Sequence, residues 1–173
     1  LRRRLIKALS RDHIAFLGPR RTGKTSILRD LERNPPAGTS ALYLDLQGLR
    51  SVPAWLSLML KETKKLLQTP PDKLAWLKQA GKGTVSVLKR LESITVLGTG
   101  IKLTPGQPAV DLWEPIADEF LTLIREHELP ITFMLDEFPW FLGHVAANHS
   151  PTEVDATLNW FRKVRQELAD GPT

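Results

Sequence analysis

Residues 13–25 read His-Ile-Ala-Phe-Leu-Gly-Pro-Arg-Arg-Thr-Gly-Lys-Thr, in which a short apolar run leads into the spacing G-x-x-x-x-G-K-T. This spacing is typical of a loop that wraps a phosphate group at the start of a helix. Gly18 and Gly23 allow the backbone to bend until successive N–H groups point inward, and the positive end of the next helix faces the same anion. We therefore predict a strand at 14–17, a phosphate-binding loop and a helix. An ordinary glycine turn is the alternative, and the apolar residues on both sides of the loop disfavour it.

Two side chains of this pattern are expected to act on the nucleotide and its metal. Lys24 reaches the β- and γ-phosphates as a point charge, and the Thr25 hydroxyl is a magnesium ligand. The sequence thus predicts a nucleoside triphosphate and Mg²⁺ as the ligands. The residues expected to bind the nucleotide are Gly18, Pro19, Arg20, Arg21, Thr22, Gly23, Lys24, Thr25 and Ser26.

A second apolar run, at 131–137, reads Ile-Thr-Phe-Met-Leu-Asp-Glu and ends in two carboxylates. An acidic residue at the carboxyl end of a buried parallel strand lies where open α/β sheets bind their ligands. Asp136 is therefore expected to hold Mg²⁺, through water, opposite Thr25. Glu137 is expected to polarise the water that attacks the γ-phosphate, which makes it a catalytic residue together with Lys24. A strand that simply ends in a solvated acidic turn is the alternative, and the phosphate loop upstream disfavours it.

The composition describes one globular domain with a positive charge excess. The chain has 173 residues, of which 42% are hydrophobic and 25% charged, and a net charge of +5. A positive field near the phosphate loop would attract a nucleotide polyphosphate, and could equally attract nucleic acid. We favour the nucleotide because no base-stacking motif accompanies the charge. The basic residues near the loop are Arg2, Arg3, Arg4, Lys7, Arg11, Arg20 and Arg21.

The sequence contains no signal for disulfide formation, membrane insertion or secretion. The chain has no cysteine, which excludes disulfides. No apolar run approaches the roughly 18 residues that span a bilayer, and the basic start lacks the apolar stretch of a secretory signal. Because ATP and Mg²⁺ are abundant inside cells, we expect a cytoplasmic protein.

Hydrophobic spacing predicts the remaining elements. The alternation of Ile94, Val96, Ile101 and Leu103 around Gly98-Thr99-Gly100 predicts a β-hairpin. Between the Asp136 strand and Ser150-Pro151 we expect a loop. The other predicted elements are a basic amphipathic helix at 1–9, a phosphate-loop helix ending near Asn34, a strand at 41–46, a helix from Pro53 with Leu56, Met59, Leu60, Thr63 and Leu67 on one face, a short helix after Asp72, and helices at 116–127 and 152–169.

The tryptophans and histidines carry no functional motif. The five tryptophans, at positions 55, 76, 113, 140 and 160, do not cluster in the sequence, and core packing is favoured over a base-stacking platform. The four histidines lack the spacing of zinc ligands.

The two motifs together resemble a known family. Gly18-Pro19-Arg20-Arg21-Thr22-Gly23-Lys24-Thr25-Ser26 is similar to the phosphate-loop signature of the archaeal and bacterial AAA+/STAND-type ATPases, and the sequence from Asp136 to Leu142 resembles their second motif. A weaker similarity extends through Tyr43-Leu44-Asp45 and 94–104. The resemblance implies a P-loop three-layer α/β/α sandwich, with a mainly parallel sheet, that binds ATP, with Asp136 on magnesium and Glu137 as the catalytic base.

The same resemblance implies that part of the core is missing. In this class the sheet order is 5-1-4-3-2 along the chain, strand 4 carries a polar sensor residue, and a helical lid follows strand 5. Nothing after Asp136 reads as a strand. We therefore expect residues 1–173 to be one P-loop ATPase core that is part of a longer protein.

Two classes of function follow. The first is a Mg²⁺-dependent ATPase that drives conformational change in an effector domain or partner, with homo-oligomerisation as one route. The second is a nucleotide-gated switch with slow hydrolysis, which would not need Glu137 beside the metal carboxylate. A GTPase is disfavoured because no Asn-Lys-x-Asp motif follows; a small-molecule kinase and a nucleic-acid motor stay open. Arg162 and Arg165 are conceivable fingers for a neighbouring site, although a solvated helix face is the more ordinary interpretation.

Overall fold

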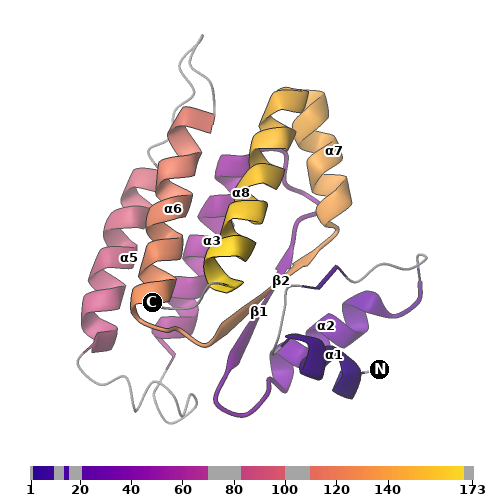
Figure 1. Ribbon diagram of the computed structural model, residues 1–173, viewed down its shortest axis with the longest axis vertical. Helices are drawn as coiled ribbons and strands as arrows, with labels where there is room; N and C mark the ends of the chain where they lie inside the picture. The colour runs from indigo at the N-terminus through magenta and orange to yellow at the C-terminus, as the bar shows by residue number, and fades with distance from the viewer. Residues whose placement is uncertain (1, 10–13, 16–20, 70–82, 100–109, 170–173) are drawn as a thin grey trace.

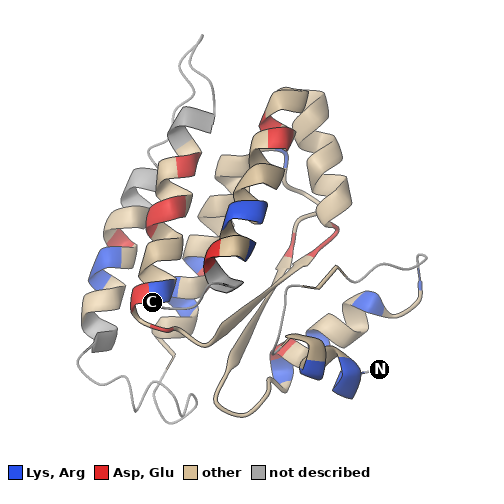
Figure 2. Cartoon of the chain, viewed as in Figure 1, with Lys and Arg blue, Asp and Glu red and all other residues tan. Residues whose placement is uncertain are grey.

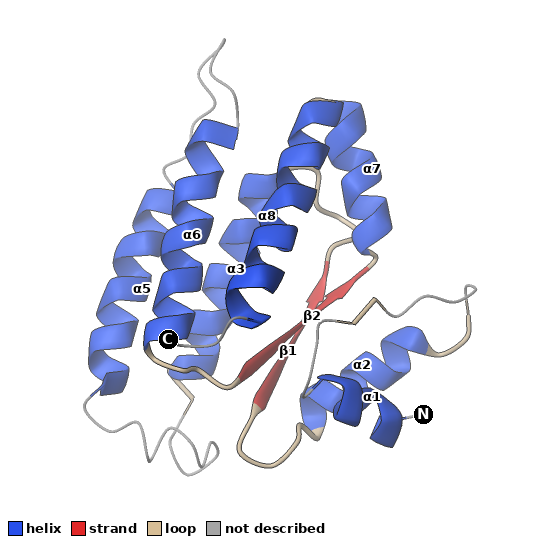
Figure 3. Ribbon diagram, in the orientation of Figure 1, coloured by secondary structure: helices blue, strands red, loops and turns tan. Residues whose placement is uncertain are grey.

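The computed structural model describes residues 2–9, 14–15, 21–69, 83–99 and 110–169 (Figure 1). The described chain is mixed α/β, with helices around a small parallel sheet (Figure 3). Its elements are α1 (Arg2–Leu9), α2 (Lys24–Arg33), β1 (Ser40–Asp45), α3 (Val52–Leu67), α5 (Gly83–Thr99), α6 (Val110–Glu126), β2 (Ile131–Asp136), α7 (Phe138–Asn148) and α8 (Pro151–Ala169).

The described sheet consists of β1 and β2, which run parallel and pair from Ser40 with Ile131 to Asp45 with Asp136. Figure 1 shows α1 and α2 on one side of this pair and the other helices on the opposite side. Side chains alternate along a strand, so each strand contributes to both sides. Strands that are covered on both faces are apolar throughout, and this explains the near-continuous apolar runs of the two strands.

The core on the α1–α2 side is small. It contains Leu31 of α2, Ala41 and Tyr43 of β1, and Met134 of β2. The partly buried side chains that pack against it come from both helices: Leu5, Ile6, Leu9, Ile27 and Leu28. The basic amphipathic helix expected at the start of the chain is therefore present, and its apolar face lies on α2 and the sheet.

The core on the opposite side is much larger and is rich in aromatic rings. Trp160 of α8 makes edge-on contacts with Trp55 of α3 and Trp113 of α6, with ring centroids 5.7 and 6.4 Å apart. The five tryptophans are far apart in the sequence, yet Trp55, Trp113 and Trp160 meet here because α3, α6 and α8 pack together. Phe138 and Phe141, at the start of α7, join the same cluster through Phe161 and Trp55. This contact anchors the segment that directly follows Asp136 and Glu137.

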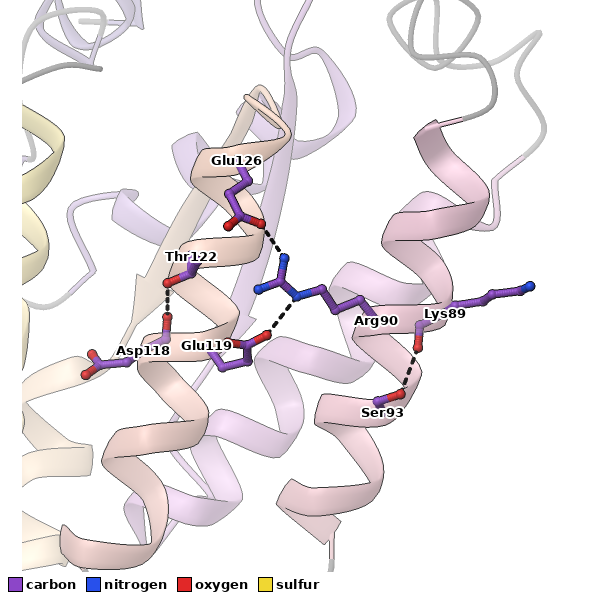
Figure 4. Close-up of polar contacts among 7 residues, drawn as sticks. All are labelled: Lys89, Arg90, Ser93, Asp118, Glu119, Thr122 and Glu126. Carbon is purple, nitrogen blue, oxygen red and sulfur yellow. Dashed lines mark hydrogen bonds and ion pairs between the residues drawn. The ribbon is translucent and has the colours of Figure 1, made fainter. Parts of the chain in front are cut away.

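Polar contacts link the helices at the surface of this larger core. Figure 4 shows Arg90 of α5 reaching Glu119 and Glu126 of α6, with 2.7 Å between Arg90 Nε and Glu119 Oε1. Asp118 of α6 accepts hydrogen bonds from Trp160 Nε1 and Lys163 Nζ of α8, at 2.9 and 2.6 Å. Because the charged groups are partly exposed, these pairs orient the helices more than they stabilise them.

Several predicted elements are confirmed. Helix α2 ends at Arg33, immediately before Asn34 and Pro35-Pro36. In α3, Ser51 caps the helix by accepting a hydrogen bond from the Ala54 N–H, and the whole predicted face from Leu56 to Leu67 is buried. The strand expected at 41–46 and the last helix also form, with small differences in their ends.

The predicted hairpin at 94–104 is wrong. Residues 83–99 form α5, and residues 100–109 lie outside the described part of the chain. Val87, Leu91 and Ile94 are buried in the large core at spacings of four and three residues, which is helical spacing. This packing against α3 and α6 outweighs the local alternation that suggested strands.

The loop expected after Asp136 is also wrong, because α7 occupies most of it. Pro139 lies in the first turn of α7, where a proline is compatible with a helix. Phe141 and Val145, four residues apart, are buried in the core and hold the helix against α8.

Half of the first predicted strand, at 14–17, falls outside the described residues. Ile14 and Ala15 are described and are not in a strand, whereas 16–20 are not described. In the order 5-1-4-3-2 strand 4 would separate this first strand from the Asp136 strand, and that gap lies outside the described part of the chain, as does the short helix expected after Asp72.

Candidate nucleotide and magnesium site

The two sequence motifs meet at the carboxyl end of the sheet. Asp136 is the last residue of β2, and Thr25 lies in the first turn of α2. The Thr25 hydroxyl donates a hydrogen bond to Asp136 Oδ2 at 2.7 Å, across 111 residues of sequence. Asp136 is 8% exposed and Thr25 is exposed. The contact predicted between these two side chains is therefore present in the fold.

Among the described residues, Thr25 is one of three groups that donate hydrogen bonds to the Asp136 carboxylate. Its Oδ2 atom also accepts from the Tyr43 hydroxyl at 2.8 Å, and its Oδ1 atom accepts from the backbone N–H of Glu137 at 3.1 Å. A buried carboxylate must be satisfied in this way, since an unpaired buried charge is costly. These bonds fix the carboxylate plane from the neighbouring strand, from α2 and from the backbone that follows.

Tyr43 connects Asp136 to α2. The Arg29 guanidinium lies 3.7 Å from the centroid of the Tyr43 ring, and Glu32 Oε1 accepts the Tyr43 backbone N–H at 3.2 Å. Arg29 and Glu32 also form an ion pair at 3.0 Å. Burial, followed by the hydrogen bond to Asp136, raises the pKa of the Tyr43 hydroxyl above its ordinary value. Tyr43 is therefore the donor in its contact with Asp136.

The start of α2 has the backbone expected of an anion-binding turn. Gly23 precedes the helix with φ +81°, and Arg21 has φ 62°. A Cβ on Gly23 would meet no atom within 4 Å, so the glycine is needed here for its left-handed backbone rather than for space. Gly23 makes no side-chain cap, and its carbonyl accepts the Ile27 N–H at 3.1 Å.

Glu137 occupies a strained position between β2 and α7. It precedes α7 with φ 55°, a conformation that costs a non-glycine residue about 1–3 kcal/mol. Its side chain does not cap the helix. The turn places the Glu137 carboxylate directly after Asp136 and near the positive end of α7.

The other predicted residues divide into two groups. Arg21 and Thr22 are exposed in the turn before α2, Lys24 is half-buried at its first position, and Ser26 is exposed one residue beyond Thr25. Gly18, Pro19 and Arg20 lie outside the described residues. Arg162 and Arg165 are exposed on α8, and Arg162 contacts Asn159 of the same helix.

The oxygen atoms gathered at Thr25 and Asp136 fit a magnesium ion. A hydroxyl that donates its proton to a carboxylate keeps lone pairs for a cation. Mg²⁺ is commonly bound by one or two protein oxygens together with water and phosphate oxygens. Such a site needs no larger cluster of protein ligands. Among the described residues, no group of three or more His, Cys, Asp or Glu side chains is arranged to hold a metal ion.

Sequence reasoning missed the residues that support this site. Tyr43 lies in the strand expected at 41–46, and neither of the two motifs contains Tyr43, Arg29 or Glu32. Asp45 is the last residue of β1 and lies beside Asp136 in the strand register. Its carboxylate accepts a hydrogen bond from the Gln47 N–H. Figure 2 shows acidic residues gathered where the two strands end. The alternation of Tyr43 and Asp45 on one face of β1 was the available signal.

Comparisons with known proteins add no assignment. No family model, curated protein or solved structure compared with this chain matched it. Among the described helices, none has the length and apolar character needed to span a bilayer.

Proposed function

We propose that this chain binds ATP and hydrolyses it with Mg²⁺. The observation that carries the proposal is the 2.7 Å hydrogen bond between Thr25 and Asp136. It joins the end of a G-x-x-x-x-G-K-T pattern to the carboxylate at the end of a buried parallel strand. These are the two oxygen ligands that a nucleotide-bound magnesium ion requires from the protein.

Each residue has a distinct role in the proposal. The N–H groups at the start of α2 and the Lys24 ammonium bind the phosphates, while Thr25 and Asp136 hold the metal. Bound Mg²⁺ supplies positive charge that offsets the charge on the β- and γ-phosphate oxygens. Glu137 orients a water molecule and accepts its proton. The water oxygen bonds to the γ-phosphorus, the bond to the bridging oxygen breaks, and ADP and phosphate leave.

The fold that accompanies this proposal is the P-loop three-layer sandwich. Two observations support it: helices cover both faces of the described sheet, and β1 lies beside β2. In the order 5-1-4-3-2 the second and third strands along the chain are neighbours, and β1 and β2, which pair directly, would be those two strands. The energy of hydrolysis would then move an effector domain or a second copy of the chain in the cytoplasm.

Nucleotide titration by calorimetry tests the proposal. The wild type should bind Mg²⁺·ADP, and Lys24→Ala should bind it at least about tenfold more weakly, because a hydrogen bond to a charged group contributes about 1.5–3 kcal/mol. Lys61→Ala is the matched control, since Lys61 is exposed on α3. Equal affinity of wild type and Lys24→Ala would remove the phosphate loop from the mechanism.

A further inference from the structure

We propose that Tyr43 is a positioning residue for Asp136, and that its hydroxyl sets how much Mg²⁺ the site requires. The inference rests on the proposed function, because it assigns Asp136 to magnesium. It adds a residue on β1, outside both sequence motifs, and connects the metal carboxylate to the phosphate-loop helix.

The first argument is the geometry of the carboxylate. Thr25 and Tyr43 both donate to the Oδ2 atom of Asp136, at 2.7 and 2.8 Å. With the Glu137 N–H on Oδ1, rotation of the carboxylate would break at least one bond. If Thr25 turns its oxygen toward a metal, Tyr43 is the side chain that continues to hold Oδ2 in place.

The second argument is that Tyr43 itself is fixed. Its ring is buried with Leu31, Ala41 and Met134, and Arg29 covers the ring face. Glu32 holds its backbone N–H from α2. The ring is therefore held against the helix that begins at Lys24, with its hydroxyl on Asp136.

Hydrogen-bond partners of metal-ligating carboxylates orient the ligand, and their loss typically costs about 10–100-fold in metal affinity. Tyr43→Phe removes the hydroxyl and leaves the ring, so the packing and the Arg29 contact are retained. We expect the Mg²⁺ concentration for half-maximal ATP hydrolysis by the full chain to rise about 10–100-fold. Affinity for ADP measured in EDTA should equal that of the wild type, because no metal is bound.

The matched control is Thr157→Val. Thr157 is a fully buried hydroxyl of α8 that donates to the Glu153 carbonyl at 2.8 Å. This variant also replaces a buried hydroxyl by a hydrocarbon group, but it lies on the large-core side of the sheet. Its Mg²⁺ midpoint should match the wild type even if its stability falls.

A spectroscopic measurement tests the same contact without removing the Tyr43 hydroxyl. Tyr43 is the only tyrosine of the chain, so incorporation of 3-fluorotyrosine gives one ¹⁹F resonance. Adding Mg²⁺ to the ADP-saturated protein should shift this resonance, and the shift should be absent in Asp136→Asn. This readout keeps the inference testable if Tyr43→Phe does not fold.

The outcomes separate the inference from the function on which it rests. Three results would overturn the role of Tyr43 and leave the ATPase proposal standing. The first is a Mg²⁺ midpoint in Tyr43→Phe equal to that of the wild type, and the second is a Mg²⁺ midpoint raised as much in Thr157→Val as in Tyr43→Phe. The third is a ¹⁹F resonance that does not change when Mg²⁺ is added. A wild-type chain that binds no nucleotide refutes the ATPase proposal itself.

Discussion

The two faces of the described sheet differ in size and in chemistry. Towards α1 and α2 lies a small cluster in which Tyr43 links a charged pair to Asp136. Towards the other helices lies the large aromatic core, with Leu44, Phe133 and Leu135 packed into it. Because side chains alternate along a strand, adjacent residues of one short strand serve these two environments.

This difference suggests that one face of the sheet provides most of the stability and the other carries the candidate site. Buried apolar area is the main source of stability, and the larger core holds most of it. The smaller side carries hydrogen bonds and charges that need fixed positions but little area. Substitutions at the site should therefore change chemistry with little loss of stability, and substitutions in the aromatic core should do the opposite.

The largest expected effect tests the chemical side. Glu137→Gln keeps the shape of the side chain and removes the charge that accepts a proton, while Lys24, Thr25 and Asp136 continue to hold nucleotide and metal. Loss of a positioned base typically costs about 10²–10⁴-fold in rate, or roughly 3 to 5 kcal/mol. Phosphate release and ATP binding, measured side by side, should show lost hydrolysis with retained affinity.

Glu128→Gln is the matched control, since Glu128 also has positive φ, at 45°, but lies before β2 at the opposite end of the strand. It should hydrolyse ATP as the wild type does. If the wild type barely turns over ATP and Glu137→Gln changes nothing, a nucleotide-gated switch replaces the enzyme as the function.

The next prediction tests the stability side. Trp55 is fully buried and contacts Phe141, Trp160 and Phe161. Replacing a buried tryptophan by alanine removes these contacts and leaves a cavity, which typically costs about 3–5 kcal/mol. Urea unfolding should show this loss in Trp55→Ala.

Trp140→Ala provides the comparison, because Trp140 is 47% exposed on α7. Its free energy of unfolding should change far less than that of Trp55→Ala. Equal losses in the two variants would mean that the aromatic core does not carry the stability assigned to it.

The smallest effect concerns a carboxylate on the large-core side. The Glu153 side chain is 4% exposed, and burial raises its pKa above the ordinary 4.5, partly offset by His149 and by the Val52 N–H. Between the unfolded and folded pKa values the native state binds more protons, so this group lowers stability as pH rises through that window. Glu153→Gln should therefore raise Tm at neutral pH, and the gain should vanish in acid.

Asp155→Asn is the control on the same helix, since Asp155 is exposed. In thermal unfolding from about pH 4 to 8, the gain in Tm at neutral pH should appear in Glu153→Gln and not in Asp155→Asn, because only Glu153 is buried. A lower Tm for Glu153→Gln at every pH would show that the charge of Glu153 stabilises the fold.

The sequence by itself determined the features that depend on neighbouring residues. Gly23 and the spacing to Thr25 predicted the turn and helix, Pro35-Pro36 predicted the end of α2, and the run from Ile131 to Asp136 predicted a buried strand with a terminal carboxylate. It also predicted that Thr25 and Asp136 would meet, since both belong to the carboxyl edge of one sheet.

Only the tertiary structure decided the rest. The alternation of apolar residues around Ile94 is typical of a strand, yet packing against α3 and α6 favours a helix there. Phe138 and Phe141 stabilise α7 because they pack into an aromatic cluster formed by distant residues. The Tyr43–Asp136 bond spans 93 residues and depends on the register of β1 against β2. The periodicity of one segment shows which of its residues share a face. It does not show which residues of another strand will lie beside them, because that depends on how the two strands pair.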